Sequence, residues 1–204
     1  MNTVLRYIGL PWLVLALWMQ PAFAEVSEPE RLIRETSNLV LAEIKTRQQE
    51  FRDDPAKLTA MVDEKVLQHF DFSRMTALAL GRYKRKVTAE QKPRVIAAFR
   101  ELLVRTYGKA LLEYNDQKIV FLPMRGNIDK GQVTVRTEIE QPGGFPIPLS
   151  YDMYLKEGQW KVYDITVDKI SLVTNYRSSF ARTIKQSGID GLIESLTQRN
   201  QESS

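Results

Sequence analysis

One stretch of the chain decides its fold: Trp160-Lys161-Val162-Tyr163-Asp164-Ile165-Thr166-Val167-Asp168-Lys169-Ile170-Ser171-Leu172-Val173-Thr174-Asn175-Tyr176-Arg177-Ser178-Ser179-Phe180. Its first half is rich in aromatic and β-branched residues, which predicts a strand. In its second half apolar residues recur at spacings of three and four, which predicts one face of a helix: Val173, Tyr176, Phe180 and Ile184. Ser171 stands in the short turn between the two halves as a candidate N-cap. A strand that leads into so apolar a helix must pack against most of the domain.

Three strands are predicted before this one, and two of them alternate between apolar and polar side chains. Such alternation is expected of a sheet with one buried face and one wet face. Short turns containing Gly and Asn join the strands and indicate an antiparallel meander. The four predicted strands cover residues 119–124, 132–140, 147–155 and 159–167.

Amphipathic helices with recognisable caps are predicted around the strands. Asp54 precedes a Pro in the first turn of one helix. Gly81 follows the end of the next helix, and Thr88 with Gln91 forms a capping box that opens a third. The helices before the sheet are expected over residues 29–52, 54–67, 73–80 and 88–114.

The helices at the two ends of the mature chain have distinct features. The first shows an apolar stripe at helical spacing, formed by Leu32, Ile33, Leu39, Val40 and Ile44. The last is expected to break at Gly188, with Asp190 capping a final short helix. Helices flanking one antiparallel meander define an α+β domain with a twisted sheet of four strands or slightly more, wrapped by helices. Helices packed on a strongly twisted sheet can leave a cavity, although periodicity alone does not distinguish a hollow core from a solid one.

The amino terminus has the pattern of a secretory signal peptide. A basic residue, Arg6, precedes an apolar run over residues 7–19, and Ala22-Phe23-Ala24 has the small-x-small form of a cleavage site. We expect cleavage after Ala24, which makes residues 1–24 the signal and 25–204 a single periplasmic domain. The alternative is an uncleaved anchor, but the apolar run is shorter than the roughly 20 residues of a spanning helix. Cleavage removes one base and no acid, so the net charge falls from +4 by one unit.

Composition excludes several kinds of chemistry. The chain has no cysteine, which excludes disulfides, thiolate metal sites and a cysteine nucleophile. It has a single histidine, His69, so histidine-clustered metal sites are excluded, and we interpret His69 as structural or surface. No Gly-rich phosphate loop is present, and no basic stripe with interleaved aromatics predicts nucleic-acid binding. We therefore expect no metal and no cofactor.

Asp164 is the residue on which an enzymatic alternative depends. Both faces of its strand are apolar, so a buried Asp164 could serve as a general base with a raised pKa. The simpler interpretation is structural: the carboxylate pairs with an arginine such as Arg177, or accepts from a backbone amide near the Ser171 turn. Asp152 is expected to face water, since it points away from its apolar neighbours Tyr151 and Met153.

Several motifs make the chain similar to a known family, the periplasmic phospholipid-binding proteins of the maintenance-of-lipid-asymmetry pathway (the MlaC, or toluene-tolerance auxiliary, family). The likeness covers most of the mature chain, and the stretch after Trp160 is its most specific part. Three positions depart from the family pattern: Lys84, where Trp is frequent, Lys169, where Gly is frequent, and Ser179, where Gln is frequent. The matching motifs are Phe70-Asp71-Phe72 with Met75, Ala79-Leu80-Gly81-Arg82-Tyr83, Phe99, Leu102-Leu103, Thr106-Tyr107, Trp160-Lys161-Val162-Tyr163-Asp164-Ile165, Ser171-Leu172-Val173, Asn175-Tyr176-Arg177 and Phe180.

The resemblance implies a fold and a function. The fold is a nuclear-transport-factor-like cone with a deep apolar cavity. The function is that of a periplasmic carrier, not an enzyme, which holds glycerophospholipid by its acyl chains. The carrier passes lipid between an outer-membrane lipoprotein complex and the substrate-binding ring of an inner-membrane ABC transporter, and so maintains outer-membrane lipid asymmetry. We expect it to act as a monomer. An enzyme that uses Asp164, or a periplasmic adaptor with a solid core, remains the alternative.

Strand alternation and helix phase predict which residues line a lipid cavity. They are Phe72, Met75, Leu103, Tyr107, Leu111, Val135, Leu149, Tyr151, Val162, Ile165, Leu172, Val173 and Tyr176. A local basic cluster follows Gly81 and is a candidate for the cavity rim or for a partner contact. The candidates in this cluster are Arg82, Tyr83, Lys84 and Arg85, followed by Lys86. They are expected to meet anionic head groups or an acidic partner, or else to form a solvated loop.

Overall fold

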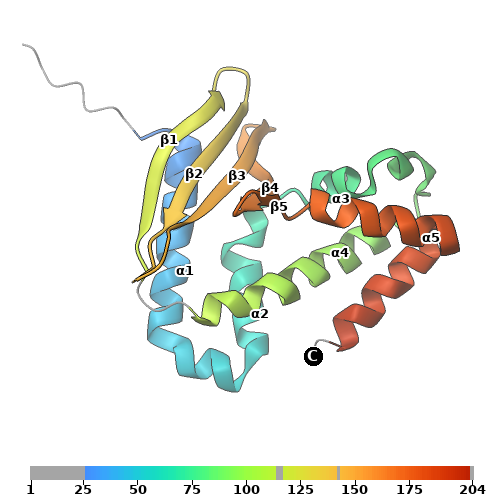
Figure 1. Cartoon of the computed structure of the whole chain (residues 1–204), viewed down its shortest axis with the longest axis horizontal. Coiled ribbons are helices and arrows are strands. Elements are labelled where there is room, and N and C mark those ends of the chain that lie inside the picture. The colour runs from blue at the N-terminus through green and yellow to red at the C-terminus, as the bar shows by residue number, and fades with distance from the viewer. Residues whose placement is uncertain (1–25, 114–116, 142, 203–204) are drawn as a thin grey trace, which may run out of the picture.

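The computed structural model describes residues 26–113, 117–141 and 143–202, so the predicted signal peptide lies outside the described residues. Figure 1 shows the sheet and the helices α1 and α2 in one half of the molecule and α3 and α5 in the other, with α4 running between the halves. The α-helices are α1 (Glu28–Asp53), α2 (Pro55–Lys65), α3 (Phe72–Leu80), α4 (Gln91–Gly108) and α5 (Arg177–Glu202). Short 3₁₀ segments are η1 (Leu67–His69), η2 (Gly81–Lys86), η3 (Lys109–Glu113) and η4 (Thr174–Tyr176).

The sheet is an antiparallel meander in the order β1-β2-β3-β4-β5, which confirms the predicted α+β class. The predicted strands are present, and the short fifth strand pairs with the end of β4. Ser171 therefore ends a strand, and the N-cap of η4 is Val173, so the predicted N-cap at Ser171 is wrong. Ser171 Oγ still accepts a hydrogen bond from the Thr174 amide at 3.0 Å. The strands are β1 (Ile119–Asn127), β2 (Gln132–Ile139), β3 (Ile147–Lys156), β4 (Gln159–Val167) and β5 (Ile170–Ser171).

A β-bulge in β4 decides which side chains share a face of the sheet. Asp152 pairs with Asp164, whereas the next residue of β3, Met153, pairs with Val162, so Tyr163 is the extra residue. Cross-strand partners lie on the same face. The face that carries Val162 before the bulge consequently carries Ile165 after it.

The predicted caps at Asp54, at Gly81 and in the box of Thr88 and Gln91 are confirmed. The Asp54 side chain accepts from the Ala56 amide at 3.1 Å at the start of α2. In the capping box the Gln91 amide donates to Thr88 Oγ1 at 3.2 Å, and the Thr88 amide donates to Gln91 Oε1 at 3.1 Å. Gly81 ends α3 at φ +55°, a conformation that favours glycine.

One helical prediction needs correction, and another is confirmed. Leu39 is 42% exposed and is not part of the buried face of α1. The buried residues of α1 are Pro29, Ile33, Val40, Ile44 and Phe51. The predicted break at Gly188 is confirmed: its backbone is non-helical, at φ +73° and ψ −170°, and it separates two helical segments that together make up α5. Asp190 lies two residues after this break, and its carboxylate accepts from Arg94 and Gln91 on α4, at 3.0 and 2.7 Å.

In the described part of the chain the buried apolar residues form three clusters. The sheet core packs Ile33 of α1 on β2, β3 and β4, with Val135 and Val162 at its centre. The lower core lies between the second half of α1 and α2, around Ile44 and Phe51. The helical core joins α3, α4 and α5 and contains Val95, Phe99, Val173, Phe180 and Leu196. The sides of these three cores that face one another form the walls of a cavity.

Candidate functional site

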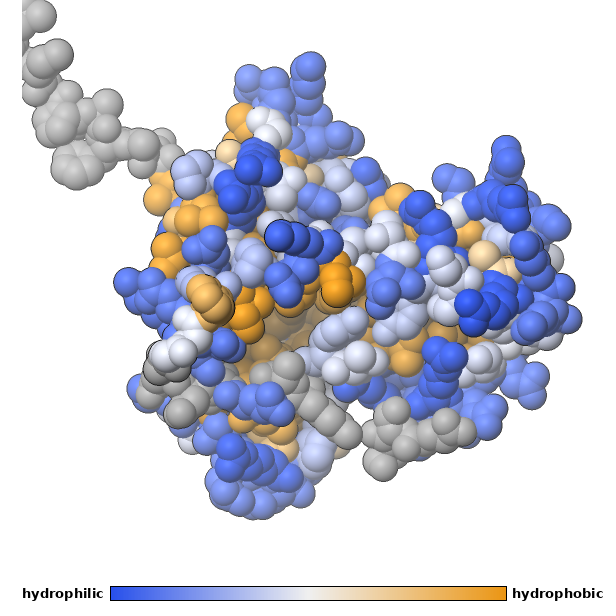
Figure 2. Space-filling model, viewed as in Figure 1, coloured by the Kyte–Doolittle hydropathy of each residue, from blue (hydrophilic) through white to orange (hydrophobic). Residues whose placement is uncertain are grey.

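An apolar cavity of about 180 Å³ lies where the three cores meet. Its walls come from α2 and η1, from the start of α3, from the second half of α4, and from β4 and Leu172. Its lining is almost entirely apolar: Val62, Val66, Leu67, Phe70, Phe72, Met75, Leu103, Val104, Tyr107, Gly108, Leu111, Ile165 and Leu172. Figure 2 shows a hollow with hydrophobic residues in its depth in the middle of the molecule.

Seven of the thirteen predicted lining residues meet around this cavity: Phe72, Met75, Leu103, Tyr107, Leu111, Ile165 and Leu172. The structure places the other six outside its described lining. Val135, Tyr151 and Val162 belong to the sheet core, and Val173 and Tyr176 to the helical core. Leu149 is half-buried in β3. Contact between any of these residues and a lipid stays a prediction.

The α2 side of the cavity was missing from the predicted set. Val62 and Val66 stand one helical turn apart, and Leu67 follows them. Helical periodicity in the sequence assigns all three to an apolar stripe. That signal does not say whether the stripe meets a packed core or a hollow.

Tyr107 contributes the hydroxyl group of the lining. Burial raises its pKa to about 12, and a hydrogen bond with the Tyr176 hydroxyl acts in the same direction. Tyr176 in turn packs edge-on against Phe99, with ring centroids 5.2 Å apart. This contact ties the cavity wall to the helical core, and it leaves the cavity without an ionised group among its described lining residues.

Asp71 is a second residue of the site whose role the sequence did not predict. It is 8% exposed and caps α3 by accepting from the Arg74 amide at 2.9 Å. It also accepts from the Tyr154 hydroxyl and, at 3.0 Å, from Lys156 Nζ, both on β3. The Arg74 guanidinium lies 4.0 Å from the ring centroids of Tyr154 and Tyr163. This polar cluster fixes the start of α3, which carries Phe72 and Met75 into the cavity wall.

Asp164 has the structural contacts that the simpler interpretation predicted. It is 7% exposed and accepts from the Val173 amide at 3.2 Å and from the Ser171 hydroxyl. Burial raises its pKa, and these hydrogen bonds oppose the increase. Arg177 is not its partner, because Arg177 Nε donates to the Leu78 carbonyl at 3.1 Å, near the end of α3. Asp152 lies on the face opposite Tyr151 but is half-buried, and it accepts from Thr134 Oγ1 at 2.7 Å.

The basic segment lies in η2, at the opposite end of α3 from the cavity residues Phe72 and Met75. Arg82, Lys84 and Arg85 are exposed, whereas Tyr83 is buried in the helical core. Arg82 donates to the Tyr83 hydroxyl at 3.2 Å and lowers the pKa of this tyrosine. None of the four lines the described part of the cavity, so their role as partner contacts stays a prediction.

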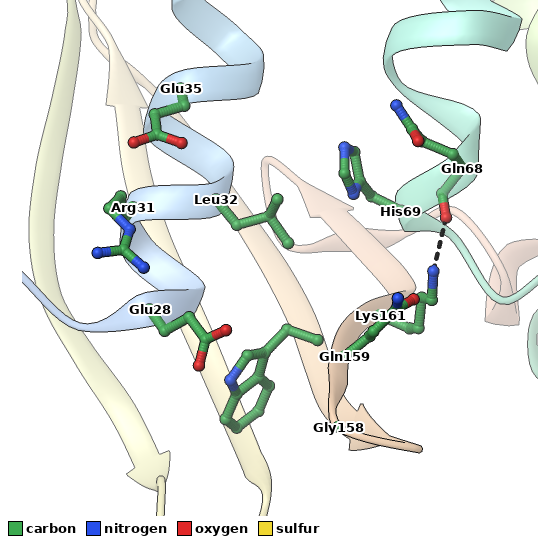
Figure 3. A pocket seen from close by; sticks show the side chains of 10 residues that line it. Glu28, Arg31, Leu32, Glu35, Gln68, His69, Gly158, Gln159 and Lys161 are labelled. Carbon is green, nitrogen blue, oxygen red and sulfur yellow. Dashed lines mark hydrogen bonds between the residues drawn. The ribbon is translucent and has the colours of Figure 1, made fainter.

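A second cleft, of about 300 Å³, has a mixed lining in which charged and polar side chains stand beside Leu32 and Trp160. Figure 3 shows Glu28, Arg31 and Glu35 of α1 on one side and Gln68 and His69 on the other, with the β3–β4 turn below them. Lys161 Nζ donates to the Gln68 carbonyl at 2.8 Å, on the side of this cleft opposite α1. Burial, and then the charge of Lys161, lower the pKa of His69. Mixed charges and exposed carboxylates make this cleft unsuitable for acyl chains, so the smaller apolar cavity is the candidate functional site.

The described part of the chain contains no group of three His, Asp or Glu side chains that could hold a metal ion. None of its helices combines the length and the apolarity that crossing a membrane requires. An α+β domain with an apolar cavity between its helices and its sheet, with one hydroxyl and no charge in the described lining, belongs to the class of proteins that hold an apolar ligand out of water.

The chain belongs to the MlaC family, because the family model described as MlaC protein matches residues 34–198. It is 27% identical over 199 residues to the intermembrane phospholipid transport system binding protein MlaC of Haemophilus influenzae, covering 96% of this chain and 91% of that protein. The toluene tolerance protein ttg2D of Pseudomonas putida is 26% identical over 163 residues, which are 79% of this chain and 75% of that protein.

A solved structure supports the fold independently. The phospholipid-binding protein of Ralstonia solanacearum, determined in complex with a phospholipid, superposes with a TM-score of 0.80 at 31% identity. The match covers 87% of this chain and 99% of the other. The predicted family and the predicted fold class are thus both confirmed.

Proposed function

We propose that the mature chain is a carrier that holds glycerophospholipid by its acyl chains. The observation that carries the proposal is the apolar cavity at the junction of three cores, lined by thirteen described residues without a charge. One relative is named for phospholipid transport, and a structural neighbour with 31% identity binds a phospholipid.

The energetics of transfer explain why such a lining is sufficient. Moving one acyl CH₂ out of water contributes about 0.8 kcal/mol. Two long chains therefore give a gross gain of roughly 20 kcal/mol or more, which is near the ceiling for noncovalent affinity. A bilayer offers its lipids the same gain, so a protein that matches the bilayer in apolar content exchanges lipid at nearly zero net cost. Direction must then come from partners, and no catalytic group is needed.

The size of the cavity requires that its walls separate during loading. A volume of about 180 Å³ is below the roughly 300–1,000 Å³ of pockets that hold drug-sized ligands. The walls belong to three separately packed clusters. Moving one cluster relative to another enlarges the cavity without opening the interior of any cluster, so the fold can admit acyl chains and remain folded.

The cellular setting is part of the same proposal. The pattern of residues 1–24 supports export to the periplasm, with cleavage after Ala24. There the carrier takes lipid from an outer-membrane lipoprotein complex or delivers it to one, and exchanges it with the substrate-binding ring of an inner-membrane ABC transporter. It acts as a monomer and catalyses no reaction, and the polar contacts of Asp164 support the structural role of that residue.

Native mass spectrometry of the purified mature protein, residues 25–204, tests the proposal. We expect phospholipid to copurify with it. Leu172→Glu should abolish the bound lipid while the domain stays folded, because Leu172 is half-buried and borders the cavity. The matched control is Ile170→Glu, two residues away on β5, 57% exposed and outside the described lining, which should keep its lipid. Wild-type protein that never carries lipid, even after incubation with vesicles, would refute the carrier function.

A further inference from the structure

An ion pair joins the two helices that form one wall of the cavity. Arg100 Nη2 of α4 lies 2.7 Å from Asp63 Oδ1 of α2, and both side chains are 39% exposed. Asp63 neighbours Val62, and Arg100 stands one helical turn before Leu103 and Val104. The pair therefore lies at the solvent-facing edge of the cavity wall.

The guanidinium of Arg100 also faces the cavity lining directly. Its Cζ lies 5.7 Å from the centroid of the Phe72 ring, and that ring stacks on Phe70 at 5.9 Å. Both rings line the cavity. A phosphate that stands at the end of acyl chains in this cavity would thus reach the guanidinium at the border between apolar lining and water.

Asp63, the partner of Arg100, has a carboxylate oxygen without a hydrogen bond. Asp63 Oδ1 is buried and accepts no hydrogen bond within the described residues, so the contact with Arg100 is an ion pair without hydrogen-bond geometry. A phosphodiester offers a guanidinium two acceptor oxygens in the planar arrangement that suits bidentate binding. Arg100 can therefore leave the carboxylate of Asp63 for a better acceptor.

We propose that Arg100 binds the phosphodiester of the carried glycerophospholipid, and that Asp63 holds the guanidinium in place until the lipid arrives. This inference rests on the proposed carrier function, and it names the residue that recognises the head-group phosphate. The chemistry recognised is a phosphate monoanion, which a lipid head group and a free phosphate share.

The test compares lipids with and without a phosphate. Mature protein is loaded with phosphatidylglycerol or with diacylglycerol of the same chains, and loss of each lipid to acceptor vesicles of neutral lipid is followed. Arg100→Ala should speed the loss of phosphatidylglycerol by about tenfold, near the lower end expected for a hydrogen bond to a charged group at a half-exposed site. It should leave the loss of diacylglycerol unchanged. Equal acceleration of the loss of both lipids would mean that the pair of Arg100 and Asp63 only holds α2 and α4 together, and it would overturn the assignment.

Two further variants sharpen the test. Arg94→Ala removes another α4 arginine that pairs with an aspartate of another helix, at 3.0 Å from Asp190, and should leave both rates unchanged. Asp63→Asn should retain phosphatidylglycerol at least as well as the wild type, because the competing carboxylate is gone. A loss as fast as that of Arg100→Ala would contradict the proposal.

Free phosphate is distinguished by competition. Inorganic phosphate, compared with chloride at the same ionic strength, should leave the wild-type rate unchanged, since it has no acyl chain to hold it at the cavity. A phosphate-specific acceleration as large as the effect of Arg100→Ala would assign the site to the free anion and overturn the lipid assignment. Wild-type protein that can be loaded with neither lipid would instead refute the carrier function itself.

Discussion

Replacing Asp71 by Ala should destabilise the domain more than the loss of an ordinary helix cap. The change removes the acceptor for the Arg74 amide at the start of α3, which costs about 1 kcal/mol. It also leaves the Tyr154 hydroxyl without its carboxylate acceptor, which costs a further 1–2 kcal/mol or so. The ion pair with Lys156 adds little, because the lysine side chain is 43% exposed. The free energy of unfolding should fall by about 2–3 kcal/mol.

Thermal melting of the mature domain measures this effect. At about 2–4 °C per kcal/mol for a domain of this size, the melting temperature should fall by about 4–12 °C. Asp54→Ala is the matched control, because Asp54 caps α2 through the Ala56 amide and, among the described residues, its carboxylate joins no second element in this way. It should cost about 1 kcal/mol, or about 2–4 °C. Equal losses in the two variants would refute the idea that Asp71 ties α3 to the sheet.

The pH dependence gives an independent check on Asp71. Burial alone would raise its pKa, but the Tyr154 hydroxyl, the Arg74 amide and Lys156 together hold the pKa below its ordinary value of 3.8. A carboxyl group whose pKa is lowered by folding stabilises the folded state above its unfolded pKa, and this contribution is lost as the pH falls through the folded value. The melting-temperature deficit of Asp71→Asn should therefore be full at pH 7 and shrink below about pH 4. A deficit that stays constant down to pH 3 would contradict this account.

Two further outcomes follow from the structure. Asp164→Asn should lower the melting temperature by about 2–4 °C, because the amide group replaces one of two buried acceptor oxygens. Lipid should stay bound, and no reaction product should form. An unchanged melting temperature together with the loss of some chemical conversion would favour the enzyme. Lys84→Glu combined with Arg85→Glu in the exposed η2 segment should slow lipid exchange with anionic vesicles at low salt. The difference in rate from the wild type should shrink as added salt screens the charges. An unchanged rate at low salt would mean that this segment is only solvated and has no part in lipid exchange.

Local sequence patterns predicted the parts of the fold that local interactions determine. The capping box of Thr88 and Gln91, the cap at Asp54 and the glycine end of α3 each depend on residues within a few positions of one another. The strand pattern gave the antiparallel order for the same reason, since short turns leave adjacent strands little choice of partner. Leu39 shows the limit: an apolar residue near a stripe can still be exposed when its helix packs at another phase.

The bulge at Tyr163 explains why one strand could not be interpreted by alternation. Trp160 and Val162 predict one buried face of β4, whereas Ile165 and Val167 predict the other. The extra residue between them changes the phase, so all four point the same way, opposite Leu155, Met153, Tyr151 and Leu149 of β3. Bulge position is set by cross-strand register, which a single sequence does not contain. The missing α2 side of the cavity has a similar cause, because it depends on how three separately packed clusters meet.

The polar contacts that join the elements of the cavity wall are strong on one side of the cavity and weak on the other. On the strong side, Asp71 joins α3 to β3, and Asp164 joins β4 to the turn before α5, both through buried carboxylates with several donors. On the other side, α2 and α4 are joined by the half-exposed pair of Asp63 and Arg100, whose geometry is not that of a hydrogen bond. A buried multidentate anchor costs far more to break than an exposed ion pair. Separation of the walls should therefore begin between α2 and α4, at the edge where Arg100 can meet a phosphate.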